Sequence, residues 1–224
     1  MKKKILGIIL ARSGSKRIKN KNIKKFKNKP LINWTIDTAT KSNKFCNIIV
    51  SSDSFKILEI AKLANKKVLT LKRPKNLSAD KSSSEIAALH ALKWYEKKFS
   101  KIDYIALLQP TSPFRTLKTI NKSLKEILNP KINAVISIKM VKSDHNNSKL
   151  FYLTNKNFCK RLGDKKSFKP TYVINGILYL IKKSFFVKNI NFSPPNFKPI
   201  IIHSKKENVD IDTVDDWNYA KKFI

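Results

Sequence analysis

The 224-residue chain has a hydrophobic content of 42% and is the size of one larger globular domain that can bury a core. Its two cysteines, Cys46 and Cys159, lie far apart without C-x-x-C spacing, which argues against a disulfide framework or a zinc site and favours a reducing cytoplasm. No apolar run approaches the ~18–20 residues that span a bilayer, and the short run at 5–11 meets Arg12 at once, so neither a membrane span nor a secretory signal is expected.

The formal net charge is +33, because the chain has 48 lysines and arginines and only 15 aspartates and glutamates. Such an excess first suggests binding to nucleic acid, for which the cations are expected to cluster. Here the lysines are spread along the whole chain, while asparagine and isoleucine are abundant and glycine is scarce, a combination that A/T-rich codons produce. We interpret the charge mainly as a solvated lysine coat, and a basic nucleic-acid-binding protein stays as a rival hypothesis.

Strands and helices are predicted in alternation along the chain, which favours an α/β fold with a parallel sheet. The predicted strands are 5–10, 47–51, 67–71, 102–108, 134–139, 172–181 and 199–203, and the predicted helices begin at Pro30–Ile32 and span 55–64, 85–98, 116–128 and 214–223. We expect a single domain over 1–224, built on one doubly wound, mostly parallel sheet with helices on both faces. A polar excursion at about 141–171 is interpreted as a lid or a dimerisation arm. Gly176, inside a strand, predicts a close backbone approach or a bulge.

The first predicted strand, Ile5–Leu10, ends in a small, polar and cationic loop, ARSGSKRIKNKN. An open α/β sheet presents backbone N–H groups and cations to phosphates at the carboxyl ends of its strands. The sequence has neither a Walker loop nor a G-x-G-x-x-G loop, so the prediction depends on side-chain chemistry. Arg12 follows the strand, and its planar fork can bridge two phosphate oxygens. We predict a triphosphate-binding loop; the alternative is an ordinary basic loop in a lysine-rich protein.

Two further polar motifs follow predicted strands. In QPTSPFR, two prolines fix the backbone directly after the strand 102–108, which would hold Gln109 and Arg115 at the mouth of a crevice. In VDIDT, Asp210 and Asp212 alternate as on an extended segment, so both carboxylates can point the same way. Oxygen donors of this kind suit Mg²⁺. The alternative for the second motif is an N-cap of the last helix.

Taken together, these motifs resemble the CMP-sialic acid synthetase (acylneuraminate cytidylyltransferase) family. The resemblance runs in order from Ile5 to Trp217 through ILARSGSKRIKNKN, KPLINWTI, IVSSDS, KRPKNLSADKSSS, LLQPTSPFR, NGILYLI and VDIDTVDDW. It implies a nucleotide-diphospho-sugar transferase-like fold, Mg²⁺ as cofactor, and a homodimer in which the excursion reaches the partner's site. The implied enzyme transfers CMP from CTP to the anomeric hydroxyl of a nonulosonic (sialic-type) acid and releases pyrophosphate.

The resemblance also implies roles for individual residues. It assigns Arg12 and Lys21 to the CTP phosphates, Ala11, Arg12, Asn22, Arg73, Ser83 and Ser84 to the nucleotide, Gln109, Lys149, Lys165, Asn175 and Tyr179 to the sugar acid, and Asp210 and Asp212 to the metal. From the residues alone, Arg73 fits an ordinary surface arginine equally well, and the two serines fit an N-cap for the helix that follows.

The sequence departs from the family pattern at three positions. The first loop of the family usually has glycine at the position of Arg17. Relatives that act on pseudaminic acid also tend to replace this glycine. Lys165 stands near an expected substrate-binding arginine and lacks its bidentate grip on a carboxylate. The proline expected before Lys149 is absent. The identity of the sugar therefore stays open among sialic, legionaminic, pseudaminic and eight-carbon acids.

Overall fold

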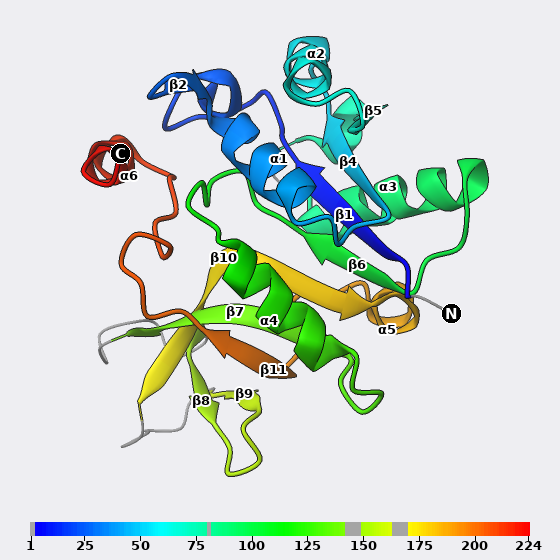
Figure 1. The fold of residues 1–224 in the computed structure, drawn as a ribbon, viewed down its shortest axis with the longest axis vertical. Helices are drawn as coiled ribbons and strands as arrows, with labels where there is room; N and C mark the ends of the chain where they lie inside the picture. The colour runs from blue at the N-terminus through cyan, green and yellow to red at the C-terminus, as the bar shows by residue number, and fades with distance from the viewer. Residues whose placement is uncertain (1–2, 80–81, 142–148, 163–169) are drawn as a thin grey trace.

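The computed structural model describes residues 3–79, 82–141, 149–162 and 170–224, and a nine-stranded sheet crosses them in the order β5-β4-β1-β6-β10-β7-β11-β9-β8 (Figure 1). Its strands are β1 (Ile5–Leu10), β4 (Asn47–Ser52), β5 (Leu69–Lys72), β6 (Tyr104–Leu107), β7 (Ala134–Val141), β8 (Phe151–Leu153), β9 (Cys159–Arg161), β10 (Thr171–Lys182) and β11 (Asn196–Ile201). A second, two-stranded sheet joins β2 (Lys25–Phe26) to β3 (Lys29–Pro30).

The sheet is mixed, which corrects the prediction of a mostly parallel one. Parallel pairing joins β5, β4, β1 and β6 in one half of the sheet, and β7 with β11 in the other. Between these halves, β10 pairs antiparallel with both β6 and β7. Sequence periodicity finds strands but does not set their direction, because an antiparallel strand buried on both faces has the same apolar pattern as a parallel one.

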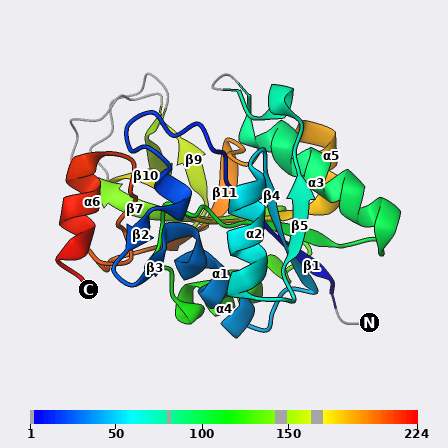
Figure 2. The same cartoon turned by 90° about the horizontal axis from the view of Figure 1, so that it is seen from above.

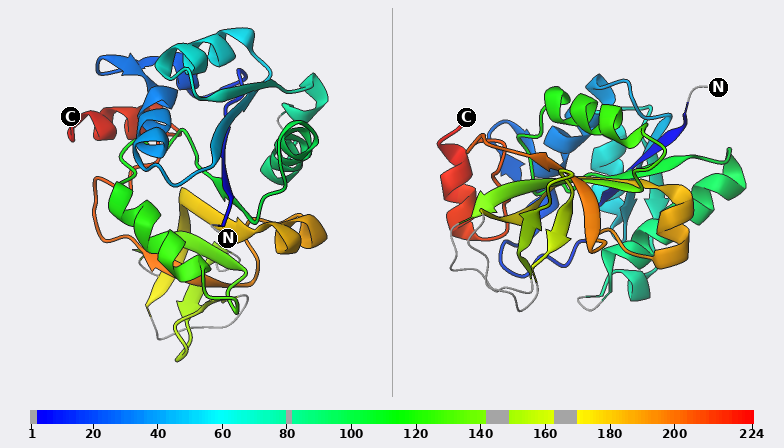
Figure 3. Two further views of the ribbon diagram at one scale, coloured as in Figure 1. Left: turned by 45° about the vertical axis from the view of Figure 1, so that its right-hand side comes forward. Right: turned by 90° about the horizontal axis from the view of Figure 1, so that it is seen from below.

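Helices cover both faces of this sheet (Figure 2 and the right view of Figure 3). The helices are α1 (Leu31–Lys41), α2 (Phe55–Ala64), α3 (Ser84–Lys98), α4 (Leu117–Ile127), α5 (Lys183–Asn189) and α6 (Val214–Lys221), with short 3-10 turns at Lys21–Ile23 and Lys75–Leu77. One apolar cluster joins α1, α2 and α4 to the first face, and another joins α3 and α5 to the second. Among the described residues, none of these helices has the length and apolarity needed to cross a membrane.

The strand β1 shows why the core forms where the sequence predicts it. Its side chains alternate between the two clusters: Ile5 and Ile9 pack on the first face, and Leu6 and Ile8 pack on the second. Because successive side chains of a strand point to opposite faces, an uninterrupted apolar run is what a strand covered on both sides requires. The predicted first strand is confirmed with its bounds unchanged.

A third apolar cluster lies away from the sheet faces and ties the first loop to the C-terminal segment. It contains Ile18, Phe26, Leu31, Phe114, Val209, Ile211, Trp217 and Ala220. Phe26 forms its centre, since its ring meets those of Trp34, Phe114 and Trp217 edge-on at 5.2–6.0 Å. Residues almost 200 positions apart are thereby held side by side.

The segment predicted as an excursion contributes to the sheet where it is described. Within residues 149–162, β8 and β9 pair with each other and with β10 and β11. These strands were missed because they are only three residues long, too short for a period to show. A lid or dimerisation role for the segment stays a prediction.

Candidate active site

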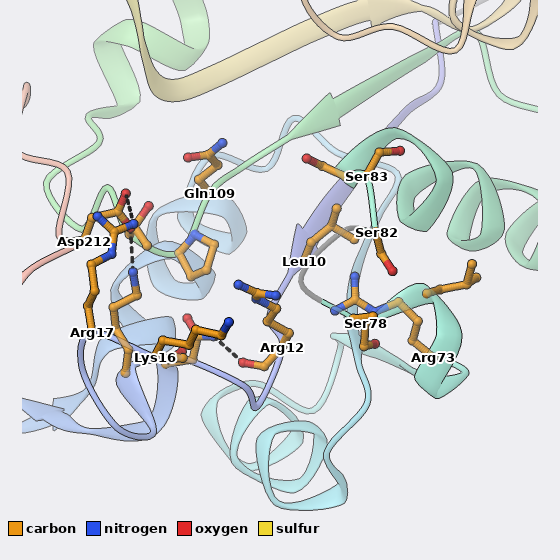
Figure 4. Close-up of a pocket in the computed structure, with 18 of the residues that line it drawn as sticks. Leu10, Arg12, Lys16, Arg17, Arg73, Ser78, Ser82, Ser83, Gln109 and Asp212 are labelled. Atoms are coloured by element: carbon orange, nitrogen blue, oxygen red, sulfur yellow. Dashed lines mark hydrogen bonds and ion pairs between the residues drawn. The ribbon is translucent and has the colours of Figure 1, made fainter.

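A cavity of about 430 Å³ opens at the carboxyl ends of β1 and β6 (Figure 4). Its walls come from the segments 10–22, 73–79, 82–84 and 107–111 and from Asp212, and they include both polar and apolar side chains. These segments follow β1, β5 and β6, which all point the same way in the parallel half of the sheet. Ligands of open α/β sheets bind at this edge, so topology alone makes the cavity the candidate site.

The loop after β1 is fixed by hydrogen bonds to its own backbone and to the next strand. Asn22 is buried, and its side-chain amide donates to the carbonyl of Arg12 at 3.0 Å. Asp53, just beyond β4, accepts from the backbone N–H of Ser13 at 2.9 Å and from its hydroxyl at 2.6 Å. Burial alone would raise the pKa of Asp53, but these hydrogen bonds and the nearby Arg73 bring that pKa below its usual value. The loop therefore presents Arg12 from a constrained backbone.

Two cations of this loop hold the carboxylate of Asp212. The ammonium of Lys21 lies 2.7 Å from Oδ1 and also donates to the carbonyl of Ile211 at 2.8 Å. The guanidinium of Arg17 lies 3.5 Å from Oδ2 (Figure 4). Lys21 was predicted to hold phosphates. In this structure its ammonium uses two of its three N–H donors for Asp212 and the carbonyl of Ile211 in the C-terminal segment.

The neighbouring acids have distinct environments. Asp216 accepts hydrogen bonds from the backbone and hydroxyl of Thr213, which itself caps α6 in a reciprocal capping box. Burial alone would raise the pKa of Asp216, but these hydrogen bonds bring that pKa below its usual value. For Asp210, burial raises the pKa, a hydrogen bond with Thr111 opposes the rise, and the charge of Asp212 adds to it. The alternative that Asp212 or Thr213 caps the helix is thus confirmed for Thr213.

The wall of the cavity opposite Arg17 and Asp212 carries Arg73, Ser83 and Ser84, which the resemblance assigns to the nucleotide (Figure 4). Arg73 is buried rather than on the surface, and its Nε is buried without a hydrogen-bond partner among the described residues. Burial lowers its pKa, while Asp53 counteracts this. Ser83 caps α3 by accepting from the N–H of Ile86 at 3.2 Å, and Ser84 is the first residue of that helix. Both serines therefore line the cavity and also form the N-terminal end of α3.

Gln109 lines the cavity just beyond the end of β6, and a glycine on β10 makes room for it. A Cβ built on Gly176 would lie 2.6 Å from Oε1 of Gln109, and the φ of Gly176 is +78°. The pairing register between β10 and β7 shifts around this residue, between Ile174 and Tyr179. The prediction of a close approach or a bulge at Gly176 is confirmed by the close approach of Gln109, and the strand pairing is irregular there.

Arg115 was predicted at the crevice mouth, and the structure places it elsewhere. Its side chain is buried and donates to the carbonyl of Ile177 at 2.6 Å, the hydroxyl of Thr35 at 3.1 Å and the carbonyl of Gln109 at 2.9 Å. Burial lowers its pKa to about 9, against the effect of Glu207 and Asp210, so it stays charged at neutral pH. Arg115 holds the QPTSPFR loop and does not face the cavity.

The chain matches known proteins over nearly its whole length. The family model described as cytidylyltransferase matches residues 6–222. The chain belongs to the cytidylyltransferase family. It is 31% identical to the CMP-N,N'-diacetyllegionaminic acid synthase of Legionella pneumophila, over 99% of this chain and 96% of that protein. It is 42% identical to the N-acylneuraminate cytidylyltransferase of Escherichia coli, over 56% of this chain and 28% of that protein. The resemblance predicted from the motifs is confirmed, and the chain is a nucleotidyltransferase.

The fold of this cytidylyltransferase is also that of a solved structure. A CMP:2-keto-3-deoxy-manno-octonic acid synthetase complexed with CTP superposes with a TM-score of 0.77, covering 98% of each chain. The sequence identity is 12%, so this likeness concerns the fold alone.

Several residues predicted to bind substrate in this cytidylyltransferase lie outside the cavity wall. Ala11 is fully buried and donates its N–H to the carbonyl of Ser51. On β10, Asn175 is buried and bonded to Asn208, and burial raises the pKa of the partly buried Tyr179. Lys149 is exposed beside β8, and Lys165 lies outside the described residues.

Other cavity residues of this cytidylyltransferase were not singled out from the sequence. Ser78, Ser82 and Thr111 line the cavity from loops. Asp53 is the residue whose role a sequence argument could have found, because it follows β4, and the carboxyl ends of neighbouring parallel strands meet at one edge. In the same run, SSDS, the next residue, Ser54, caps α2.

Proposed function

We propose that this cytidylyltransferase transfers CMP from CTP to the anomeric hydroxyl of a nonulosonic acid and releases pyrophosphate. The observation that carries the proposal is the single cavity that joins Arg12, Arg73 and Gln109, each placed after a different strand of one parallel sheet edge. Arg12 and Arg73 provide cationic donors for an anionic nucleotide, and Gln109 provides an amide that can bind hydroxyl groups. The two relatives described above, which are named for nonulosonic acids, support the choice of sugar.

In this reaction the sugar hydroxyl oxygen bonds to the α-phosphorus of CTP as the bond to the β-phosphate oxygen breaks. The hydroxyl proton is lost, CMP stays on the sugar, and pyrophosphate leaves with an added negative charge. Arg12 and the cationic loop around it would oppose that charge, and Gln109 would orient the sugar. Catalysis of this kind works by positioning and preorganised electrostatics and needs no covalent intermediate.

The carboxylates of Asp210 and Asp212 fit a divalent cation of the kind that the family resemblance implies. Oδ1 of Asp210 is buried without a hydrogen-bond partner among the described residues, which leaves one oxygen available as a ligand. A pair of carboxylates is a plausible set of protein ligands for Mg²⁺, which is usually held by one or two carboxylates together with water and phosphate. When bound, Mg²⁺ would neutralise phosphate charge.

A panel of sugar acids assayed with CTP and Mg²⁺ for pyrophosphate release tests the proposal. We expect turnover with a nine-carbon acid of the sialic, legionaminic or pseudaminic type to exceed turnover with an eight-carbon acid. Preference for the eight-carbon acid would support the alternative substrate class. No turnover with any acid, combined with tight, salt-dependent binding to DNA or RNA, would support the nucleic-acid hypothesis instead. The homodimer and the cytoplasmic location stay predictions.

Replacing Gly176 with alanine should weaken sugar binding while leaving the nucleotide half of the site unchanged. The new Cβ would meet Oε1 of Gln109 at 2.6 Å, so the amide must move. We expect the KM of the sugar acid to rise about three- to tenfold, the value of one lost hydrogen bond, and the KM of CTP to stay within about twofold. Steady-state kinetics with each substrate varied in turn checks this; an unchanged KM for the sugar would place Gln109 away from it.

A further inference from the structure

The two cations that hold Asp212 differ in how firmly they are held. The side chain of Lys21 is 12% exposed and is also bonded to the carbonyl of Ile211, so it is part of the packed structure. The side chain of Arg17 is 65% exposed, and its contact with Oδ2 of Asp212 is a longer 3.5 Å ion pair. An exposed pair of this kind contributes little to stability and exchanges easily. Oδ2 is therefore the oxygen of Asp212 that another cation can reach.

The backbone on both sides of this ion pair is fixed. Ile18, next to Arg17, and Ile211, next to Asp212, are both buried in the third apolar cluster with Phe26 and Trp217. The bond from Lys21 to the carbonyl of Ile211 adds a polar link between the same two segments. These contacts hold the two segments together and keep the guanidinium within reach of Asp212, and rotation of the exposed Arg17 side chain is enough to separate them.

We propose that Arg17 is a resident counter-ion that occupies Oδ2 of Asp212 and that a divalent cation must displace. The inference rests on the proposed function, because it takes Asp210 and Asp212 as the metal ligands. A divalent cation at Asp212 and a guanidinium on the same carboxylate repel each other, so metal binding requires Arg17 to turn away. Arg17 thereby lowers the affinity of the nucleotide-free enzyme for metal.

Arg17 also lines the cavity, on the side where Arg12 and Lys16 lie (Figure 4). Once displaced, its guanidinium is free to turn toward the space in which we place the triphosphate. Metal binding would thus move one positive charge from the carboxylate into the cavity. Arg17 acts in this way as a positioning residue that links the metal site to the phosphate site.

Binding of Mn²⁺ to the nucleotide-free protein, measured by electron paramagnetic resonance with Mg²⁺ as competitor, tests the inference without any turnover. The variant Arg17→Gln removes the charge and keeps a polar side chain of similar reach, while Arg17→Lys keeps the charge. We expect Arg17→Gln to bind Mn²⁺ about tenfold more tightly than the unmodified protein, from Coulomb repulsion in a water-like dielectric, and Arg17→Lys to bind within about twofold of it.

The matched control is Lys19→Gln, the same loss of one charge at an exposed position of the same loop that does not line the cavity. It is expected to change Mn²⁺ affinity by less than about twofold, because solvent screens the more distant charge. If Arg17→Gln and Lys19→Gln bind Mn²⁺ equally while Asp212→Asn loses binding, the counter-ion role is wrong and the metal site stands. If Asp212→Asn binds as tightly as the unmodified protein, the metal assignment fails and the inference fails with it.

Discussion

Replacing Asp212 with asparagine is expected to lower the rate of pyrophosphate release at saturating substrates by about 100-fold or more. The amide keeps the shape of the carboxylate but has no charge to hold a divalent cation opposite the cations of the first loop. Lys21 keeps its bond to the carbonyl of Ile211, so the loop should stay in place. Pyrophosphate release at several Mg²⁺ concentrations measures the loss, and far-ultraviolet circular dichroism tests whether the fold is retained.

The control for this variant is Asp215→Asn. Asp215 is an exposed acid in the first turn of α6, three residues further along the chain, and its charge interacts with the helix terminus. Its loss should leave turnover within about twofold, because solvent screens an exposed charge that does not line the cavity. Full activity of Asp212→Asn would contradict the metal assignment. Equal losses in both variants would show that the acidic segment acts through its total charge.

The parts of the fold that could be predicted from the sequence are those fixed by local pattern. β1 follows from an uninterrupted apolar run, and α2 from the cap at Ser54 and the helical spacing after it; both have the predicted bounds. A close approach could be predicted at Gly176 because glycine weakens the interior of a strand and usually stands there to make room for a neighbouring group. In each case the determining interactions lie within a few residues of one another.

The parts that could not be predicted depend on contacts between distant segments. The antiparallel course of β10 depends on its pairing with β6 and β7, which no local pattern encodes. The ion pair of Arg17 with Asp212 joins positions that are almost 200 residues apart, and the third apolar cluster and the bond from Lys21 to Ile211 bring them together. The motif resemblance named these two residues without placing them, and it gave no indication that Ala11 and Asn175, which it assigns to the substrates, are buried.

Arg115 illustrates how a cation in a motif can serve the structure. Three segments meet at its guanidinium: the turn after β6 through Gln109, the strand β10 through Ile177, and the helix α1 through Thr35. If the guanidinium were removed, the buried carbonyl of Ile177 would lose its donor, while the carbonyl of Gln109 would keep the weaker bonds from Thr35 and Ser112. A buried acceptor that loses its partner costs about 1–3 kcal/mol. The orientation of Gln109 in the cavity therefore depends on a side chain that does not enter it.

Replacing Arg115 with methionine is expected to lower the free energy of unfolding by about 3 kcal/mol, because the gain from burying an apolar side chain offsets only part of the lost bonds. For a chain of this size the loss corresponds to a decrease in Tm of about 6–12 °C, measured by differential scanning calorimetry. The variant Lys118→Met, an exposed cation on α4, is the control and should shift the Tm by less than about 2 °C. Equal Tm values for the two variants would show that the three bonds of Arg115 do not stabilise the fold. A lowered Tm together with a raised KM for the sugar acid would show that the same bonds also position Gln109.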